Sequence, residues 1–286
     1  MTRRKPLLAA LALGIALPLA APAGAQTLAK IRKQGSIALG YIDGAPPFSF
    51  VDEKGQPQGY SVELCRTVAQ GLGTQLKREK LKIRWVKLTI QNRLEAVRRG
   101  QVDLECSTTT WTLGRQAQVD FSLVTFVDGA SVLARAGSDL SRLTDYNGKR
   151  IAVISGTTTE KVLRDALARR SVPAQVVLVK TRDEGLALLN DSKVEGLASD
   201  RTTLIGTVLK AAGGGVFKLL DEDFSIEPYA LVLRRGDYDM RLAVNRVLAR
   251  LYRSGEIRPI YDRWLGPLGP PSLLLSSSYF IQGLAE

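Results

Sequence analysis

The chain has 286 residues, with 40 lysine and arginine residues against 28 aspartate and glutamate residues, and a formal net charge of +12. It contains no histidine, which excludes Ser-His-Asp and Cys-His nucleophilic catalysis and every zinc site that contains histidine. The basic residues are scattered among acidic ones without a basic block, so the charge does not indicate a nucleic-acid-binding protein.

The first 25 residues have the pattern of a cleaved export signal. Three basic residues precede an apolar run over 7–20, and the small residues at 23–25 then form a signal-peptidase site. A transmembrane anchor is the alternative, but this run is shorter than the ~20 apolar residues that span a bilayer. We therefore expect cleavage after Ala25 and a protein that works in an oxidising compartment, the periplasm.

Short apolar strands alternate with amphipathic helices over residues 37–106. Strands are predicted at 37–42, 81–85 and 102–106, and helices at 62–72 and 91–99. Gly100 follows the second helix as a left-handed cap. This alternation predicts α/β layering with largely parallel sheets.

A second series of strands and helices begins after Phe126. Strands are predicted at 150–154, 176–179 and 194–199, with helices at 158–167, 186–189, 204–211, 240–253 and 257–265. The glycine run at 213–215 is an ordinary loop, because it lacks the strand-helix context of a phosphate-binding loop. The segment after Pro267 is expected to pack on the fold as an accessory element. Two α/β units in succession predict two lobes, with a ligand cleft at the carboxyl ends of the strands.

Polar side chains follow three of these strands where each strand ends. They are the hydroxyls of Thr108, Thr110 and Thr157, the guanidinium of Arg115 and the carboxylate of Asp200. A guanidinium matches an α-carboxylate, an aspartate accepts from an ammonium group, and a helix N-terminus adds free N–H groups. These groups together therefore match both the carboxylate and the ammonium group of a zwitterionic ligand. Each member also has a structural alternative: the threonines as helix caps, Arg115 as a surface partner of Asp120, and Asp200 as an N-cap.

The two cysteines, Cys65 and Cys106, lack the spacing of a metal or redox motif. In an oxidising compartment, two cysteines suggest one disulfide. Two buried thiols are the alternative.

Four segments resemble one protein family, in the family's order. They are APPFSFVDEKGQPQGYSVELC at 45–65, LTIQNRLEAVRRGQVDLECSTTTWTLGRQAQVDFSLVTFV at 88–127, SGTTTE at 155–160 and EIRPIYDRWLGP at 256–267. Together they resemble the glutamate/aspartate-binding branch of the family 3 extracellular solute-binding proteins of ABC importers.

The resemblance implies a type II periplasmic-binding fold, with two α/β lobes joined by two crossover segments near 126–131 and 225–230. The first lobe would comprise residues 26–128 and 228–286, which include the C-terminal tail, and the second lobe residues 129–227. The function that the resemblance implies is capture of a free amino acid in the cleft and delivery to an ABC permease in the inner membrane. We expect a monomer that needs no cofactor, no metal and no nucleic acid.

Site residues carry over from the family one by one. Arg115 matches the arginine that binds the ligand α-carboxylate, helped by Thr108, Thr110 and the Thr157 turn. Asp200 matches the acid that receives the α-ammonium group. Arg93 matches an arginine that reaches the side-chain carboxylate of an acidic ligand.

The chain departs from that branch at the side-chain pocket. Ile42 stands where the branch has a further arginine, Ile90 where it has a serine, and Trp111 where it has a small polar residue. Arg182 stands near the place of a histidine. Acidic ligands are the first choice, because Arg93 and Arg182 would otherwise be buried without a counter-charge. Amides and other polar amino acids come next.

Two alternatives use the same cleft. A few relatives are prephenate- or arogenate-dehydrating enzymes, which need a further carboxylic acid for general acid catalysis. The sequence offers no convincing candidate, because Glu160 lies at a helix start and Glu105 within a strand. A sensor would share the ligand site and differ only in its downstream partner.

Overall fold

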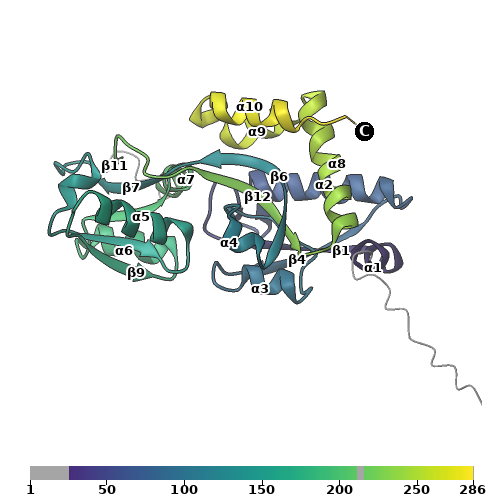
Figure 1. Cartoon of the computed structure of the whole chain (residues 1–286), viewed down its shortest axis with the longest axis horizontal. Coiled ribbons are helices and arrows are strands. Elements are labelled where there is room, and N and C mark those ends of the chain that lie inside the picture. Colours follow the sequence, from purple (N-terminus) through teal and green to yellow (C-terminus); the bar gives the residue numbers. More distant parts are fainter. Residues whose placement is uncertain (1–25, 211–215, 286) are drawn as a thin grey trace, which may run out of the picture.

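The structure is a computed structural model that describes residues 26–210 and 216–285. The predicted signal peptide (1–25) and the predicted glycine loop (213–215) lie outside the described residues. Within the described residues, no helix is long and apolar enough to cross a membrane. Figure 1 shows two α/β bodies joined by long strands.

One sheet has the strand order β4-β1-β5-β12-β6. Its strands are β1 (Ser36–Ile42), β4 (Lys82–Leu88), β5 (Leu104–Glu105), β6 (Val119–Asp128) and β12 (Glu227–Arg234). The helices of this lobe are α1 (Gln26–Gln34), α2 (Tyr60–Gln75), α3 (Arg93–Arg98), α4 (Leu113–Gln116), α8 (Tyr238–Ser254), α9 (Ile257–Leu265) and α10 (Leu273–Gln282). A short hairpin of β2 (Phe50–Val51) and β3 (Pro57–Gln58) and a 3-10 turn, η3 (Gly266–Leu268), complete it.

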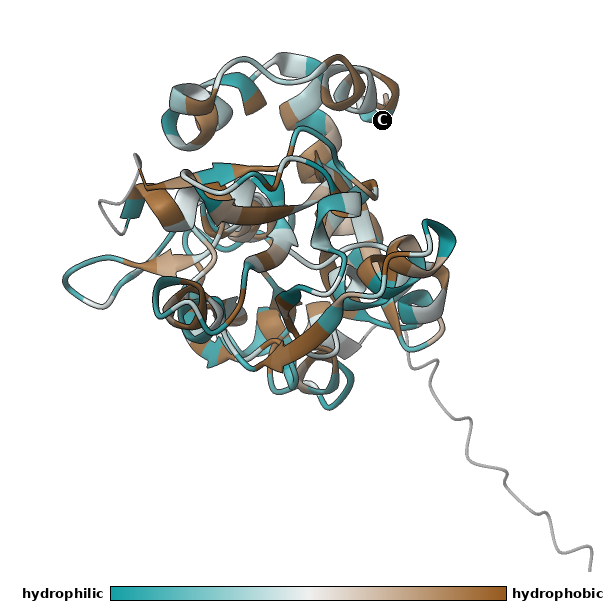
Figure 2. Ribbon diagram, turned by 90° about the vertical axis from the view of Figure 1, so that its left-hand side faces the viewer, coloured by the Kyte–Doolittle hydropathy of each residue, from teal (hydrophilic) through white to brown (hydrophobic). Residues whose placement is uncertain are grey.

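The other sheet has the order β11-β7-β10-β8-β9. Its strands are β7 (Ala130–Arg135), β8 (Arg150–Ile154), β9 (Gln175–Val179), β10 (Gly196–Asp200) and β11 (Phe217–Leu219). Helices α5 (Thr158–Arg169), α6 (Arg182–Asn190) and α7 (Arg201–Lys210), and a 3-10 turn, η2 (Leu143–Tyr146), belong to this lobe. The two-lobed α/β fold is thus as predicted, and the apolar strands of both lobes stand out against hydrophilic turns in Figure 2.

The expectation of largely parallel sheets is wrong. In each sheet two strand pairs are parallel and two are antiparallel: β12 runs against β5 and β6, and β7 runs against β10 and β11. The physical reason is that the chain leaves one lobe along β6 and returns along β12, so the two connecting strands must run in opposite directions.

The two passages between the lobes lie side by side. β6 ends at Asp128, Gly129 separates it from β7, and the returning strand β12 begins at Glu227, paired with Asp128. We propose this pair of passages as the hinge, and residues 26–128 with 228–286 and residues 129–227 as the limits of the lobes. Two such covalent links allow rotation of one lobe against the other.

Helix α10 lies against the outer edge of β6 and against α8. The ring of Tyr279 stacks on that of Tyr252 with 4.7 Å between centroids. The Gln282 side chain pairs with Val124 of β6, accepting from its N–H at 2.7 Å and donating to its carbonyl at 3.3 Å. The C-terminal segment therefore covers an otherwise open strand edge.

Cys65 and Cys106 form a disulfide, with 6.1 Å between their Cα atoms. Cys65 lies in α2, and Cys106 directly follows β5. Both residues are fully buried in the core of the first lobe. The bond therefore fixes the strand end from which the Ser107–Thr110 turn departs.

Candidate functional site

A cavity lies between the lobes at the carboxyl ends of their strands. All seven side chains singled out from the sequence line it: Arg93, Thr108, Thr110, Arg115, Thr157, Arg182 and Asp200. The other lining residues are Ile42, Ile90, Ser107, Thr109, Ile154, Thr158, Thr159, Ala198 and Ser199. The tertiary structure thus brings together residues that are up to 107 positions apart, counted from Arg93 to Asp200.

Arg115 is presented by the short helix α4. Thr112 caps this helix by accepting the Arg115 N–H at 3.2 Å, and Arg115 Nη1 donates to the Thr110 carbonyl at 2.8 Å. Burial lowers the pKa of Arg115, while the Glu227 carboxylate chiefly opposes the shift. The alternative surface pair with Asp120 is not formed, because Asp120 accepts from Arg241 instead.

Asp200 is the last residue of β10, and both of its carboxylate oxygens accept hydrogen bonds. Thr159 donates to Oδ1 at 3.0 Å, and the Tyr229 hydroxyl donates to Oδ2 at 2.6 Å. The backbone N–H of Thr202, in the first turn of α7, donates to the Asp128 carboxylate and not to Asp200. Asp200 is therefore held in place by both lobes, and its carboxylate lines the cavity.

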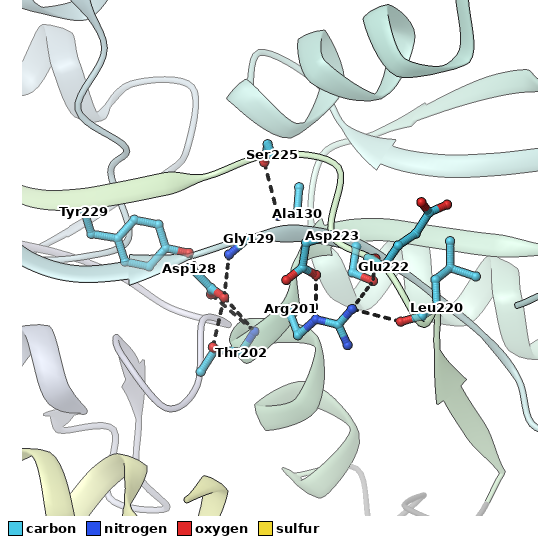
Figure 3. A network of polar contacts seen from close by, with 11 residues as sticks. Asp128, Gly129, Ala130, Arg201, Thr202, Leu220, Glu222, Asp223, Ser225 and Tyr229 are labelled. Atoms are coloured by element: carbon cyan, nitrogen blue, oxygen red, sulfur yellow. Dashed lines mark hydrogen bonds and ion pairs between the residues drawn. The ribbon is translucent and has the colours of Figure 1, made fainter. Parts of the chain in front are cut away.

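Asp128 lies at the hinge and connects the lobes, as Figure 3 shows. Its carboxylate accepts from the Thr202 hydroxyl at 3.0 Å and from its neighbour Gly129 N–H at 2.9 Å. The Tyr229 oxygen lies 3.2 Å away. Burial, followed by the negative charge of Asp200, raises the pKa of Asp128 to about 7. The sequence analysis missed this residue, although its Asp-Gly pair falls inside the predicted crossover.

Arg201 forms the second half of this hinge network. Its guanidinium pairs with Asp223 at 2.5 Å and donates to the Leu220 carbonyl at 2.8 Å and to Ser131 at 3.2 Å. Ser225 accepts the Ala130 N–H at 3.2 Å, which ties one crossover to the other. These contacts all lie within residues 129–227, so they tie the second-lobe ends of the two passages to each other.

Arg93 begins α3 and is buried where it lines the cavity. Its Nε donates to Thr109 at 2.9 Å, and its Nη1 donates to the Ile90 carbonyl. Burial, followed by the positive charge of Arg115, lowers the pKa of Arg93 to about 10, while Glu105 opposes the shift. Glu105 is fully buried on β5, and burial raises its pKa to about 7 against the effect of Arg93.

Glu105 is a buried carboxyl group whose charge acts on Arg93. As expected, no carboxylate of the described residues lies within ion-pair distance of Arg93, and Glu105 opposes only part of the fall in its pKa. An alternation of apolar and polar residues could not reveal Glu105, because the side chains on both faces of β5 are buried. The two acidic residues, Asp103 and Glu105, within the otherwise apolar run 102–106 are the signal that could have found it.

Arg182 reaches from the second lobe to the first. Its Nε donates to Ser199 at 3.1 Å and its Nη1 donates to the Gly44 carbonyl at 3.3 Å. Arg182 is only 7% exposed, and no carboxylate of the described residues lies within ion-pair distance of it. Arg182 therefore places a buried positive charge beside the cavity, where an anionic group of a ligand could pair with it.

The hydroxyl residues divide between structural and open positions. Thr157 is an N-cap, because it accepts the Glu160 N–H at 3.1 Å. Thr110 and Thr158 meet across the cleft with 3.2 Å between their oxygens. The buried Ser107 hydroxyl has no partner within the described residues and is free to bind a ligand. Trp111 stacks on Phe121 and is not part of the cavity lining.

The chain matches known proteins over most of its length. The profile of the bacterial extracellular solute-binding proteins, family 3, matches residues 37–267. An L-glutamate/L-aspartate-binding protein of Pseudomonas aeruginosa is 32% identical over 252 residues, which are 87% of this chain and 83% of the relative. A glutamate/aspartate import solute-binding protein of Escherichia coli is 29% identical over 279 residues, 96% of this chain and 92% of the relative.

The fold matches as well. An ancestral arginine-binding protein bound to arginine superimposes with a TM-score of 0.73 and 26% sequence identity, over 81% of this chain and 99% of that protein. The two bacterial relatives above are named as binding proteins for glutamate and aspartate. With the family profile spanning both lobes and the cavity between them, this chain belongs to family 3 of the bacterial extracellular solute-binding proteins.

Proposed function

We propose that this protein captures a free amino acid between its lobes and delivers it to the permease of an ABC importer. The observation that carries the proposal is that Arg115 and Asp200, which come from different lobes, line one cavity. A guanidinium and a carboxylate on opposite walls match the two charges that a free amino acid carries.

Arg115 would bind the α-carboxylate, supported by Thr108, Thr110 and the N-terminus of α5 behind Thr157. Asp200 would accept the α-ammonium group. The contacts of Asp200 with Thr159 and Tyr229 support this role, because a carboxylate already held in place loses little conformational freedom on binding.

An acidic amino acid is our first choice. Arg182 is buried with no carboxylate partner, and an anionic ligand side chain would supply the missing charge. Arg93 is already balanced in part by Glu105, so it supports this choice less than the sequence suggested. The names of the two bacterial relatives point to the same ligand class, and polar amides come next.

Binding would couple to closure about the hinge. Contacts across the cleft, such as Thr110 with Thr158 and Arg182 with Gly44, exist only when the lobes meet. A ligand that touches both lobes favours the closed state by its differential affinity for it. The closed surface would then be the one that the permease recognises.

We propose that residues 1–25 are a cleaved signal peptide and that the protein acts in the periplasm as a monomer. A periplasmic location agrees with the relatives, which are periplasmic binding proteins. Neither a cofactor nor nucleic acid is part of the proposal. Within the described residues, no cluster of acidic or cysteine side chains could hold a metal.

A calorimetric screen of the purified protein against the twenty amino acids tests the proposal. We expect binding of an acidic amino acid, and loss of more than a hundredfold in affinity for Arg115→Ala, on the order of 3 kcal/mol. Arg258→Ala is the matched control, because Arg258 is exposed on α9 and pairs only with Asp262. The proposal fails if no amino acid binds, or if Arg115→Ala binds as tightly as the parent.

We further propose that the cleft binds its ligand without turning it over. Among the described lining residues, Asp200 is the one carboxylate, and the ligand ammonium would occupy it. Glu105, with its pKa near 7, does not line the cavity. Incubation with prephenate should give no product by chromatography. Formation of a product would show that the cleft is catalytic and would overturn this proposal.

A further inference from the structure

A second, larger cavity adjoins the first between the same two lobes. It encloses about 440 Å³, against about 20 Å³ left free in the first cavity. Ile42, Ile90 and Arg182 line both cavities and therefore mark the place where the two adjoin, which we call the passage. The remaining residues that line it are Asp43, Gly44, Lys87, Leu88, Thr89, Gln91, Lys180, Thr181 and Asp183.

The passage is apolar on the side of the first lobe. Ile42 is 6% exposed at the end of β1, and Ile90 packs against the apolar clusters of both lobes. A short ligand side chain that ended here would place its carboxylate between two isoleucines, where desolvation is costly, with Arg182 as the one cation among the three shared residues. An aliphatic stem at the same place would gain from burial.

The chemistry beyond the passage suits an anion. Lys87 is already paired with Asp43 at 3.0 Å, whereas no carboxylate of the described residues lies within ion-pair distance of Lys180 or Arg182. Arg182 begins α6, and Lys180 precedes the Thr181 N-cap; the first turn of α6 also carries Asp183 and Glu184, of which Asp183 lines the cavity. Arg182 is the buried member of this pair of cations, and Lys180 is the exposed one.

We propose that the ligand is an α-amino acid whose side chain is longer than that of glutamate, with an aliphatic stem between Ile42 and Ile90 and an anionic end at Arg182 and Lys180. The inference rests on the proposed amino-acid function, since Arg115 and Asp200 hold the α-groups. It goes further by placing the end of the side chain in the second cavity.

A homologous series of α-amino dicarboxylic acids measures the length directly by calorimetry. Aspartate, glutamate, 2-aminoadipate, 2-aminopimelate and 2-aminosuberate differ only by methylene groups. We expect the dissociation constant to fall at least tenfold between glutamate and the best longer acid. If glutamate or aspartate binds best, the extended ligand is rejected and the amino-acid function stands. If no member of the series or other free amino acid binds, both proposals fail.

Lys180→Met tests the position of the anionic end. The variant should bind the best longer acid about five- to tenfold more weakly, with the same thermal midpoint as the parent without ligand. Lys193→Met is the matched control, because Lys193 is an exposed lysine of the same lobe away from both cavities. Unchanged affinity in Lys180→Met, or an equal loss in Lys193→Met, would overturn the placement.

Discussion

The hydroxyl of Tyr229 donates to Asp200 at 2.6 Å and thereby joins the strand that returns to the first lobe with the last residue of β10 in the second. Burial, with the charges of Asp200 and Asp128, raises the pKa of Tyr229 well above its ordinary value, so this hydroxyl stays a donor. The Tyr229 ring packs against Phe48, 5.4 Å between centroids. The binding carboxylate is therefore positioned by the core of the opposite lobe.

Tyr229→Phe should lower the free energy of unfolding by about 1.5–3 kcal/mol, because it removes a hydrogen bond to a buried carboxylate but keeps the packed ring. Urea unfolding measures this. Tyr252→Phe serves as the control, since its hydroxyl donates to the neutral Val124 carbonyl and should cost about 1 kcal/mol. Equal losses in the two variants would contradict a special role for the Asp200 contact.

Gly206→Ala should prevent full closure. A Cβ atom at Gly206 in α7 would lie 2.6 Å from the Pro46 carbonyl carbon of the other lobe, too close for the backbone to accept. We expect weaker ligand binding and a larger radius of gyration with ligand in small-angle scattering. Gly137→Ala is the control, because a Cβ there meets no atom within 4 Å. A variant that closes normally would show that these lobes do not meet at this glycine.

Asp128→Asn should change how stability depends on pH. The folded state raises the Asp128 pKa from 3.8 to about 7, so between these values the folded protein holds a proton that the unfolded chain releases. The contribution of Asp128 to stability is therefore lost as pH rises toward 8. Relative to the parent, the variant should gain about 2 kcal/mol in unfolding free energy from pH 5 to pH 8. Urea unfolding at pH 5 and pH 8 measures this. If the prediction is wrong, the difference in unfolding free energy between variant and parent will be the same at both pH values.

Glu105→Gln should remove a pH dependence of ligand binding. Burial raises the pKa of Glu105 to about 7, while the charges of Arg93 and Arg115 oppose the shift. A ligand carboxylate at these arginines should raise that pKa, so binding takes up a proton and affinity falls as pH rises from 6 to 8. Calorimetry should show a severalfold change in the parent and a flatter profile in Glu105→Gln. Glu95→Gln, exposed on the same lobe, should behave like the parent.

Removing the disulfide with Cys65→Ala and Cys106→Ala should lower the free energy of unfolding by roughly 3–4 kcal/mol. The bond closes a segment with a sequence separation of 41, and the unfolded chain gains the corresponding freedom when the bond is absent. Denaturant unfolding of the double variant, compared with the parent with and without reductant, measures the cost. The prediction is contradicted if reductant, added under denaturing conditions, does not lower the unfolding free energy of the parent.

The predicted strands at 37–42 and 150–154 closely match β1 and β8, because short continuous apolar runs bounded by turn residues are typical of the buried strands of a layered α/β fold. Strands β7 and β11 were not predicted. They pair with strands that are remote in the chain, as Leu133 does with Leu197, and local periodicity carries no record of such pairing.

The sequence by itself determined the α/β class, the succession of two units and the polar turns that end their strands. These features depend on neighbouring residues, whose spacing sets which face of a helix or strand is buried. Only the tertiary structure decided which charges balance one another. Folding placed Glu105 where its charge acts on Arg93 and brought the Tyr229 hydroxyl to Asp200, while Arg182 was buried with no carboxylate of the described residues within ion-pair distance. These interactions depend on distance and burial in space, which spacing along the chain does not determine.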